Sequence, residues 1–162
     1  MITKEAGAGI KEEEGPKRCT VDASVLLKLV VEEDHSLQAR QLASEFGDGR
    51  VILSAPNIID YEIGSVLYKM AKVEIVEPKY AEQAFDKLMK LPIDRVEPID
   101  HVAVLRLSIS LGIHYYDCQY IMAARELKST LVSSDEKMVK TAKRVLPQDC
   151  AIHIRDIITK SR

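Results

Sequence analysis

Short β-prone segments alternate with longer amphipathic segments along this chain, and this alternation constrains the fold more than any other feature. Strands are predicted over residues 18–21, 51–53, 95–99, 130–133 and 151–154. Helices are predicted over residues 23–31, 36–46, 56–72, 78–91, 102–111, 117–127 and 135–145. Strands separated by helices imply right-handed crossovers and a mainly parallel central sheet. We therefore expect an α/β fold with three α/β/α layers.

Length and composition set the limits of that fold. The chain has 162 residues, of which 46% are hydrophobic, which suffices for one domain with a buried core. Residues 1–15 combine Gly, Ala and an acidic run without apolar periodicity, so we predict a disordered extension followed by a single domain over residues 16–162. No apolar stretch reaches the roughly 18 residues of a membrane span, and we expect no membrane association and no secretory signal.

Charge and cysteine usage narrow the functional classes. With 23 basic and 25 acidic residues the net charge is -2, so no global basic field attracts nucleic acid and any polyanion must be bound locally. The cysteines, Cys19, Cys118 and Cys150, form no CxxC pair and are odd in number. That pattern favours a reducing compartment, and we expect a cytoplasmic protein.

Three aspartates stand where strands end or helices begin. Asp22 and Asp135 both follow predicted strands, and ligand sites in open parallel sheets form beyond the carboxyl ends of strands. Each also precedes a predicted helix, where an aspartate commonly caps exposed backbone N–H groups. The same alternative applies to Asp117, so no single aspartate identifies a site.

Glu62 differs because it is predicted in the middle of a helix. Ile58 and Val66 lie one turn away on either side, so its charge borders an apolar stripe. Such a carboxylate either extends to solvent or has a partner that offsets its desolvation, and a divalent cation is one such partner. Asp60 ranks below Glu62 because it lies in the first turns, where the helix dipole favours any anion.

Four segments carry a family resemblance: VDASVLLKLV, APNIIDYEIGSVLYKM, HYYDCQYIMAARE and TLVSSDEKMVKTA. In this order they resemble the signature segments of PIN-domain ribonucleases, and the likeness spans residues 17–157. The family's acidic positions fall on Asp22, Glu62, Asp117 and Asp135. Little of the chain remains outside this core, which is most similar to the single-domain, VapC-like toxins of toxin-antitoxin pairs.

The resemblance implies a metal-dependent endoribonuclease that uses Mg²⁺ or Mn²⁺. Converging carboxylates repel one another and raise the pKa of at least one, a cost that a cation relieves, and all-oxygen ligation suits these hard ions better than zinc. One or two metals would activate a water for in-line attack on an RNA phosphodiester, leaving 5′-phosphate and 3′-hydroxyl ends. We expect Asp22 and Asp117 as principal ligands, with Glu62 and Asp135 binding a second metal or orienting the water.

Further residues are expected around the acids. Ser24 and Ser133 match small hydroxyl positions of the family and would support the acids or a phosphate, although turn chemistry explains both equally well. RNA contacts are assigned to three cations on helices predicted to begin beside the acids, against the alternative of solvated helix faces: Lys28, Arg125 and Lys137. The expected substrate is single-stranded or structured RNA, and single strands are favoured because no groove-reading helix or aromatic stacking motif is recognisable.

Partners follow from the family alone. A VapC-like toxin implies a cognate antitoxin that inserts a basic residue among the acids. Homodimerisation is also a family expectation, for which the helices beginning near Pro56 and Pro78 offer apolar surface. The main alternative is a catalytically silent α/β protein-interaction domain whose aspartates are only helix caps, which explains Glu62 poorly. A phosphoacceptor domain is a weaker alternative, because the chain lacks early paired acids.

Overall fold

The fold is built on a central sheet whose strands are all parallel, and it is described by a computed structural model over residues 15–97 and 100–158. The predicted disordered extension lies outside the described residues, apart from Gly15. The sheet has five strands in the order β3-β2-β1-β4-β5. The strands are β1 (Lys17–Val21), β2 (Val51–Pro56), β3 (Asp94–Val96), β4 (Thr130–Ser133) and β5 (Ala151–His153). The predicted α/β class with a parallel sheet is confirmed.

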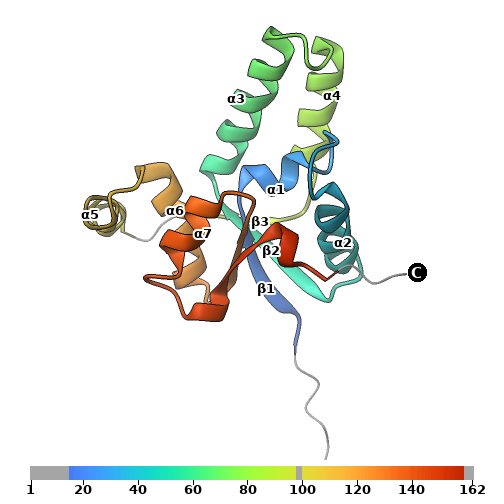
Figure 1. Cartoon of the computed structure of the whole chain (residues 1–162). Coiled ribbons are helices and arrows are strands. Elements are labelled where there is room, and N and C mark those ends of the chain that lie inside the picture. Colours follow the sequence, from blue (N-terminus) through green and yellow to red (C-terminus); the bar gives the residue numbers. More distant parts are fainter. Residues whose placement is uncertain (1–14, 98–99, 159–162) are drawn as a thin grey trace, which may run out of the picture.

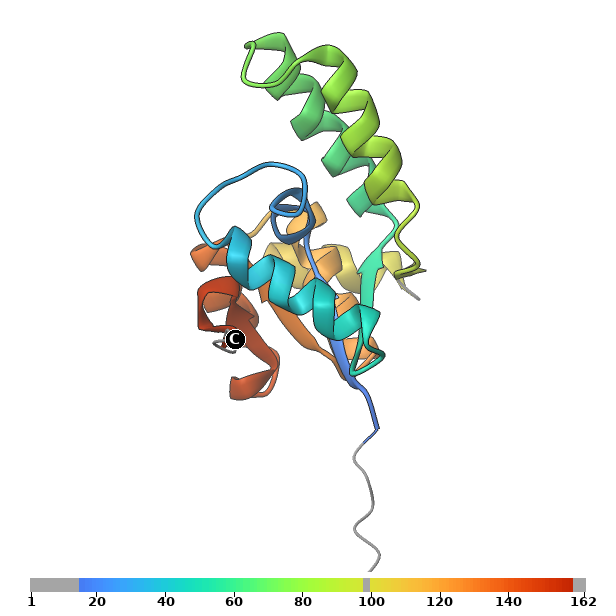
Figure 2. The same ribbon diagram turned by 90° about the vertical axis from the view of Figure 1, so that its right-hand side faces the viewer.

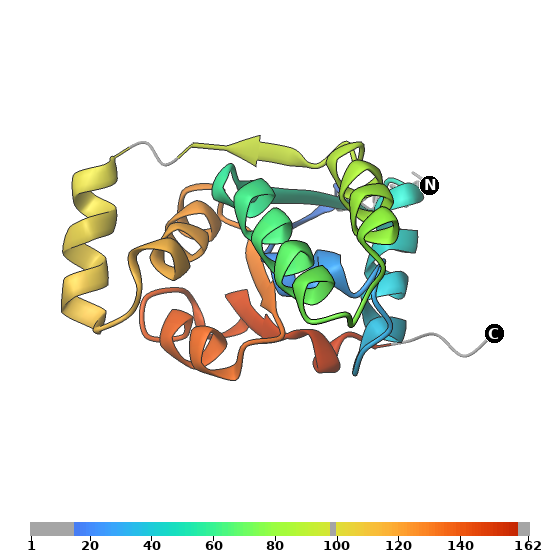
Figure 3. The same cartoon turned by 90° about the horizontal axis from the view of Figure 1, so that it is seen from above.

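Helices cover both faces of this sheet. They are α1 (Ala23–Leu27), α2 (Ser36–Gly47), α3 (Ile58–Lys72), α4 (Pro78–Met89), α5 (His101–Leu111), α6 (Tyr115–Glu126) and α7 (Glu136–Ala142), with 3-10 turns η1 (Gln148–Cys150) and η2 (Ile154–Asp156). Helix α2 packs on one face, and α6 and α7 pack on the other, which completes the three predicted layers (Figures 1 and 3). None of the helices in the described ranges is long and apolar enough to cross a membrane.

The path of the chain creates a topological switch point in the sheet. From β1 the chain proceeds outward through β2 to β3, then returns to the other side of β1 to form β4 and β5. The strand order therefore reverses between β1 and β4, and such a switch point is where open α/β sheets form ligand sites. Val21 pairs with Val132 at this point, so the residues after both strands emerge side by side.

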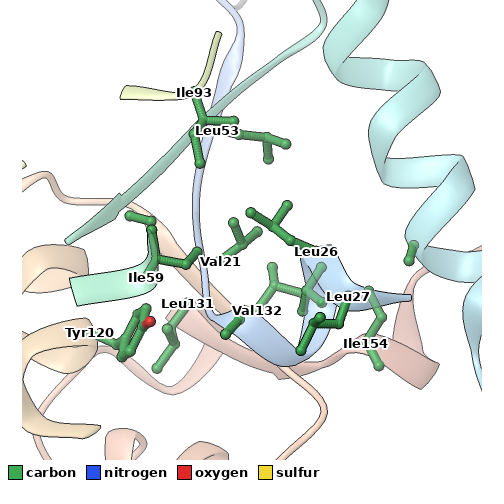
Figure 4. Close-up of a cluster of buried hydrophobic side chains, with 14 of the residues drawn as sticks. Val21, Leu26, Leu27, Leu53, Ile59, Ile93, Tyr120, Leu131, Val132 and Ile154 are labelled. Atoms are coloured by element: carbon green, nitrogen blue, oxygen red, sulfur yellow. The ribbon is translucent and has the colours of Figure 1, made fainter. Parts of the chain in front are cut away.

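The core explains why the central strands are apolar on both faces. Val21, Leu131 and Val132 are fully buried between the helical layers, as parallel strands covered on both sides require. Helix α6 is buried over residues 118–124 because it packs across β1, β2 and β4. Figure 4 shows Tyr120 of this helix among the buried side chains of the core, with its hydroxyl oxygen drawn in red.

Helices α3 and α4 form a pair that projects beyond the carboxyl edge of the sheet (Figures 1 and 2). Gly64 allows the two helices to approach closely, because a Cβ atom at this position would lie 3.4 Å from Cε2 of Phe85. Ile63, Leu67 and Leu88 of the same two helices are buried and belong to the core cluster. Of this pair, α3 lies nearer the switch point, because it carries Glu62 and contacts α1.

Several element boundaries differ from the prediction. The first helix ends at Leu27, and residues 28–31 form turns instead, with Leu29 N donating to Leu26 O at 3.0 Å and Val30 N donating to Leu27 O at 3.0 Å. Pro56 ends β2, where it pairs with Val96, and does not begin the following helix. Residues 98–99 of the predicted third strand lie outside the described residues. The three cysteines, all described, are unpaired.

Candidate functional site

Asp22 is the most enclosed acid at the carboxyl edge of the sheet. It follows β1 and caps α1, and its Oδ1 accepts hydrogen bonds from Val25 N at 3.2 Å and Ser24 Oγ at 2.5 Å. Ser133 Oγ donates to its Oδ2. The residue is 5% exposed, and burial raises the pKa of its carboxyl above the ordinary range, although the three hydrogen bonds lower the pKa.

The end of β4 is joined to this aspartate by two serines. Ser133 Oγ accepts from Asp135 N at 2.9 Å, and Ser24 Oγ accepts from Ser134 N at 3.1 Å. The two serine hydroxyls thus connect the ends of β1 and β4 across the switch point. Both serines lie beside Asp22, where the sequence predicted supporting hydroxyls.

Asp135 lies on the exposed side of the same edge. It caps α7, because its Oδ1 accepts from Lys137 N at 2.8 Å and from Met138 N at 3.1 Å. Its charge raises the pKa values of both Asp22 and Asp117. The capping alternative is therefore confirmed for Asp135, as it is for Asp22, but capping does not account for the mutual proximity of these acids.

Glu62 occupies the second turn of α3 and is half-buried. The hydroxyl of Tyr120, from α6, donates to its Oε2. Burial raises the pKa of Glu62, the hydrogen bond from Tyr120 lowers it, and the charges of Asp22 and Asp117 raise it further. Glu62 thus has a buried neutral hydrogen-bond donor as its partner, and it faces two of the aspartates.

Asp117 lies in the first turn of α6, whose N-cap residue is His114. The capping alternative considered for Asp117 is therefore wrong. Burial raises the pKa of this carboxyl first, and the charge of Asp135 raises it further, whereas His114 and Lys137 lower it. Asp117 adds α6 to α3 and to the ends of β1 and β4 as elements that contribute an acid to this group.

The four acids influence one another as a group. Charge repulsion connects Asp22 with Asp135, Asp135 with Asp117, Asp117 with Glu62 and Glu62 with Asp22. Within residues 15–97 and 100–158 none of the four forms an ion pair. The four predicted acids are therefore close enough for their charges to interact, and no ion pair among the described residues neutralises them.

The donor chemistry of this group fits a hard divalent cation. Carboxylate and serine oxygens are the donor types that Mg²⁺ and Mn²⁺ prefer, and no cysteine or histidine ligand set competes among the residues described. As the side chains stand, however, no three His, Cys, Asp or Glu residues of the described ranges converge closely enough to hold a metal ion. Mutual repulsion separates carboxylates in the absence of a counter-ion, and Mg²⁺ commonly uses one or two carboxylates and several waters.

The three predicted RNA-binding cations have different positions. Lys137 lies beside the site, since its charge lowers the pKa of Asp117. Lys28 is buried, and its Nζ pairs with Glu33 Oε2 at 3.0 Å, so the structure engages this cation within the fold. Arg125 is exposed in the last turn of α6, about 12 Å along the helix axis from Asp117 at its start.

Asp60 has a structural partner outside the group of acids, and Tyr120 belongs to the candidate site. Asp60, which ranked below Glu62, accepts from Arg95 Nε at 2.9 and 2.8 Å and forms an ion pair that joins α3 to β3. Tyr120 was not predicted as a site residue. Its position three residues after Asp117 on one helix face was the available signal, because residues at this spacing lie next to one another.

Comparisons with known proteins agree with this geometry. The PIN domain family model matches residues 19–144. Exonuclease VapC9 of Pyrobaculum aerophilum is 26% identical over 129 residues, covering 79% of this chain and 88% of that protein. The crystal structure of PAE2754 from Pyrobaculum aerophilum superposes with a TM-score of 0.63 at 23% identity, covering 86% of this chain and 92% of that one.

A second solved structure shares the fold at lower identity. VapBC2 from Rickettsia felis, bound to a DNA fragment from its promoter, gives a TM-score of 0.59 at 11% identity, covering 84% of this chain and 98% of that one. The family match covers most of the chain and includes the four acids described above. This chain belongs to the PIN-domain nuclease family and is a distant homologue of VapC proteins.

Proposed function

We propose that this protein is a divalent-metal-dependent ribonuclease whose site consists of Asp22, Glu62, Asp117 and Asp135. The observation that carries the proposal is the group of four mutually repelling carboxylates, three of them with raised pKa values, that has no ion-pair partner among the described residues. A structural role does not require such a group, because keeping like charges together costs free energy. A bound cation relieves this repulsion, and the relief favours binding of the cation.

Each acid has a distinct setting for this role. Asp22 is held in one orientation by Ser24, Ser133 and Val25 N, which suits a principal ligand. Glu62 is oriented by the buried hydroxyl of Tyr120. When bound, Mg²⁺ or Mn²⁺ supplies Lewis-acid stabilisation of the phosphodiester and makes a water more acidic. Asp117 and Asp135 complete the group from α6 and α7, with Asp135 on its exposed side.

Several considerations support RNA as the substrate and a toxin as the biological role. The family resemblance is to ribonucleases, and the relative VapC9 carries the name of a nuclease in a toxin family. That relative is called an exonuclease, whereas we propose internal cleavage. A circular single-stranded RNA distinguishes the two activities, because only an endonuclease converts it to a linear product.

A toxin requires a restraining partner. The solved relative from Rickettsia felis is a VapBC assembly, and we propose that this chain likewise binds a cognate antitoxin and forms a homodimer. The group of four acids would accept a basic side chain of the antitoxin in place of the cation. Co-expression with the antitoxin should then yield a stable complex that does not cleave RNA, and release of the antitoxin should restore cleavage.

Cleavage of end-labelled single-stranded RNA, with Mn²⁺ or with EDTA, tests the proposed function. Wild-type protein should cleave only with Mn²⁺, and Asp22→Asn and Asp135→Asn should be slower by about 100-fold or more, as expected for loss of a ligand. Asp100→Asn is the matched control, because Asp100 caps α5 by accepting from Val102 N and Ala103 N, as Asp135 caps α7. Equal cleavage by all four proteins would refute the mechanism.

A further inference from the structure

An open cavity of ≈ 650 Å³ begins at the acidic site and extends away from the sheet. Glu62 and Ser24 line it, so the cavity is continuous with the group of acids. Its other walls come from α1, the start of α6, the length of α3 and Glu33, whose charge is paired with Lys28. The volume lies within the range of small-ligand sites and holds one or two nucleotides.

Two tyrosines stand at this cavity next to the acids. Tyr61 directly precedes Glu62, Tyr116 directly precedes Asp117, and both tyrosines line the cavity. Tyr61 is 75% exposed and Tyr116 is 55% exposed, so neither ring is used in the core. Exposed aromatic rings beside a site are a common means of binding unpaired bases.

Tyr116 is supported from behind by other aromatic side chains. Its ring packs against Tyr115 with centroids 6.0 Å apart and planes at 71°, the edge-to-face arrangement. Tyr115 in turn stacks on His101 with centroids 6.5 Å apart, and its hydroxyl lies 2.7 Å from His101 Nδ1. This support holds the Tyr116 ring in place before any ligand binds, which lowers the entropic cost of binding.

The far end of the cavity carries a positive charge. Lys69 lines the cavity, is exposed and forms no ion pair among the residues that the structure describes. It follows Glu62 by two helical turns, about 10 Å along the α3 axis. The cavity thus has an acidic end that suits a cation-bound phosphate, apolar and aromatic walls, and a basic end that suits a second phosphate.

We propose that this cavity binds the nucleotide next to the scissile phosphate of a single-stranded RNA, with its base stacked between Tyr61 and Tyr116 and the following phosphate at Lys69. The inference rests on the proposed nuclease function and adds the substrate subsite. It also requires single-stranded RNA, because a base inside a duplex does not present its face to a side chain. The apolar walls alone would also suit a peptide segment of a protein partner, and the test separates the two.

The test measures kcat and KM for a short single-stranded RNA with Mn²⁺. Tyr61→Ala should raise KM by about 5- to 150-fold, the range expected for loss of one base–aromatic stack. Tyr61→Phe should retain the wild-type KM, and Tyr61→Leu should not, because stacking needs an aromatic ring. Tyr68→Ala is the matched control, since Tyr68 is an exposed tyrosine of the same helix that does not line the cavity.

A substrate with one abasic nucleotide completes the test. Placed next to the cleaved bond, it should raise KM for the wild type and have no further effect on Tyr61→Ala, because both changes remove the same contact. Additive effects would overturn the inference, as would equal KM values for Tyr61→Leu and Tyr61→Phe, which would show that residue 61 makes no base stack. Cleavage by the wild type with unchanged KM in Tyr61→Ala overturns this subsite alone, whereas no cleavage by the wild type overturns the proposed function and the subsite with it.

Discussion

Replacing Tyr120 by Phe removes one hydroxyl from the candidate site and leaves the rest of the core intact. The ring of Tyr120 is 1% exposed and packs within the core, where Phe has almost the same shape. The hydroxyl donates to Glu62 Oε2, so the substitution removes the hydrogen bond that orients this carboxylate. We predict that Tyr120→Phe impairs both stability and cleavage, while the metal ligands themselves remain.

The expected magnitude follows from the setting of this hydrogen bond. A hydrogen bond to a charged group contributes about 1.5–3 kcal/mol, and because Glu62 is only half-buried, water can replace part of the loss. We expect the free energy of unfolding to fall by about 1–2 kcal/mol, which lowers Tm by about 2–8 °C for a chain of this size. Loss of the same free energy in positioning Glu62 lowers kcat/KM by about 10-fold.

The pH dependence separates positioning from simple destabilisation. The Tyr120 hydroxyl lowers the pKa of Glu62, against burial and the neighbouring acids, which raise it. Without the hydroxyl the pKa of Glu62 rises further, so the acidic limb of the pH–rate profile should move to higher pH. The contribution of this hydrogen bond to stability is present where Glu62 is ionised and is lost as the pH falls through its pKa, so the Tm difference should narrow in acid.

The assay is Mn²⁺-dependent RNA cleavage from acidic to neutral pH, together with thermal unfolding over the same range. Tyr80→Phe is the matched control, because the Tyr80 hydroxyl donates to the backbone oxygen of Val30 instead of to a carboxylate. It should change stability without moving the pH–rate profile. An unchanged profile in Tyr120→Phe, or an equal shift in Tyr80→Phe, would refute the positioning role.

Three further predictions concern cation, pH and salt. Mg²⁺ or Mn²⁺ should raise the Tm of the wild type and not that of Asp22→Asn; an equal increase in both proteins contradicts the assignment. The pKa values of Asp22, Glu62 and Asp117 are raised above their ordinary values of 3.8, 4.5 and 3.8. The cation-free protein should therefore lose stability as the pH rises through the folded pKa values, and Asp22→Asn should lose less. Thermal unfolding in EDTA measures this loss. Lys137→Ala should weaken RNA binding and reduce its salt dependence by about one charge, whereas Arg125→Ala should leave both unchanged in a filter-binding titration.

The sequence predicted the architecture because hydrophobic periodicity reports directly on burial. Strands such as β1 and β4 are short, apolar and bounded by polar residues, and β4 was predicted with its observed bounds. Boundaries were less accurate where tertiary contacts override local preference. Pro56 resembles a helix start, yet it pairs with Val96 at the end of β2, where the missing N–H is tolerated.

The four acids were predicted from the sequence because the strand ends and the order of the family segments point to the same positions. What could not be predicted was the surrounding contacts. Lys28 was predicted to contact RNA, but the first helix ends at Leu27, and the turns that follow bury Lys28 and pair it with the exposed Glu33. Whether one residue of a short amphipathic segment is exposed or buried depends on how the next element packs against it, and a single sequence does not reveal that packing.

Aromatic contacts were missed for a similar reason. The chain contains six tyrosines and no tryptophan, and no stacking motif is recognisable in linear order. Tyr61 and Tyr116 come from helices that are far apart in the sequence, and only the fold brings them to one cavity. Each stands one residue before a candidate acid, a signal that gains meaning only after the acids are known to converge.

Binding of Mn²⁺, measured by isothermal titration calorimetry, tests most directly whether the four carboxylates form one cation site. The wild type should bind Mn²⁺, Asp22→Asn and Glu62→Gln should each bind it at least about 10-fold more weakly, and Asp100→Asn should match the wild type. Asp100 is the appropriate comparison because it is a capping aspartate whose charge does not shift the pKa of the site acids. Equal Mn²⁺ affinity in all four proteins, or no binding by the wild type, would contradict the account.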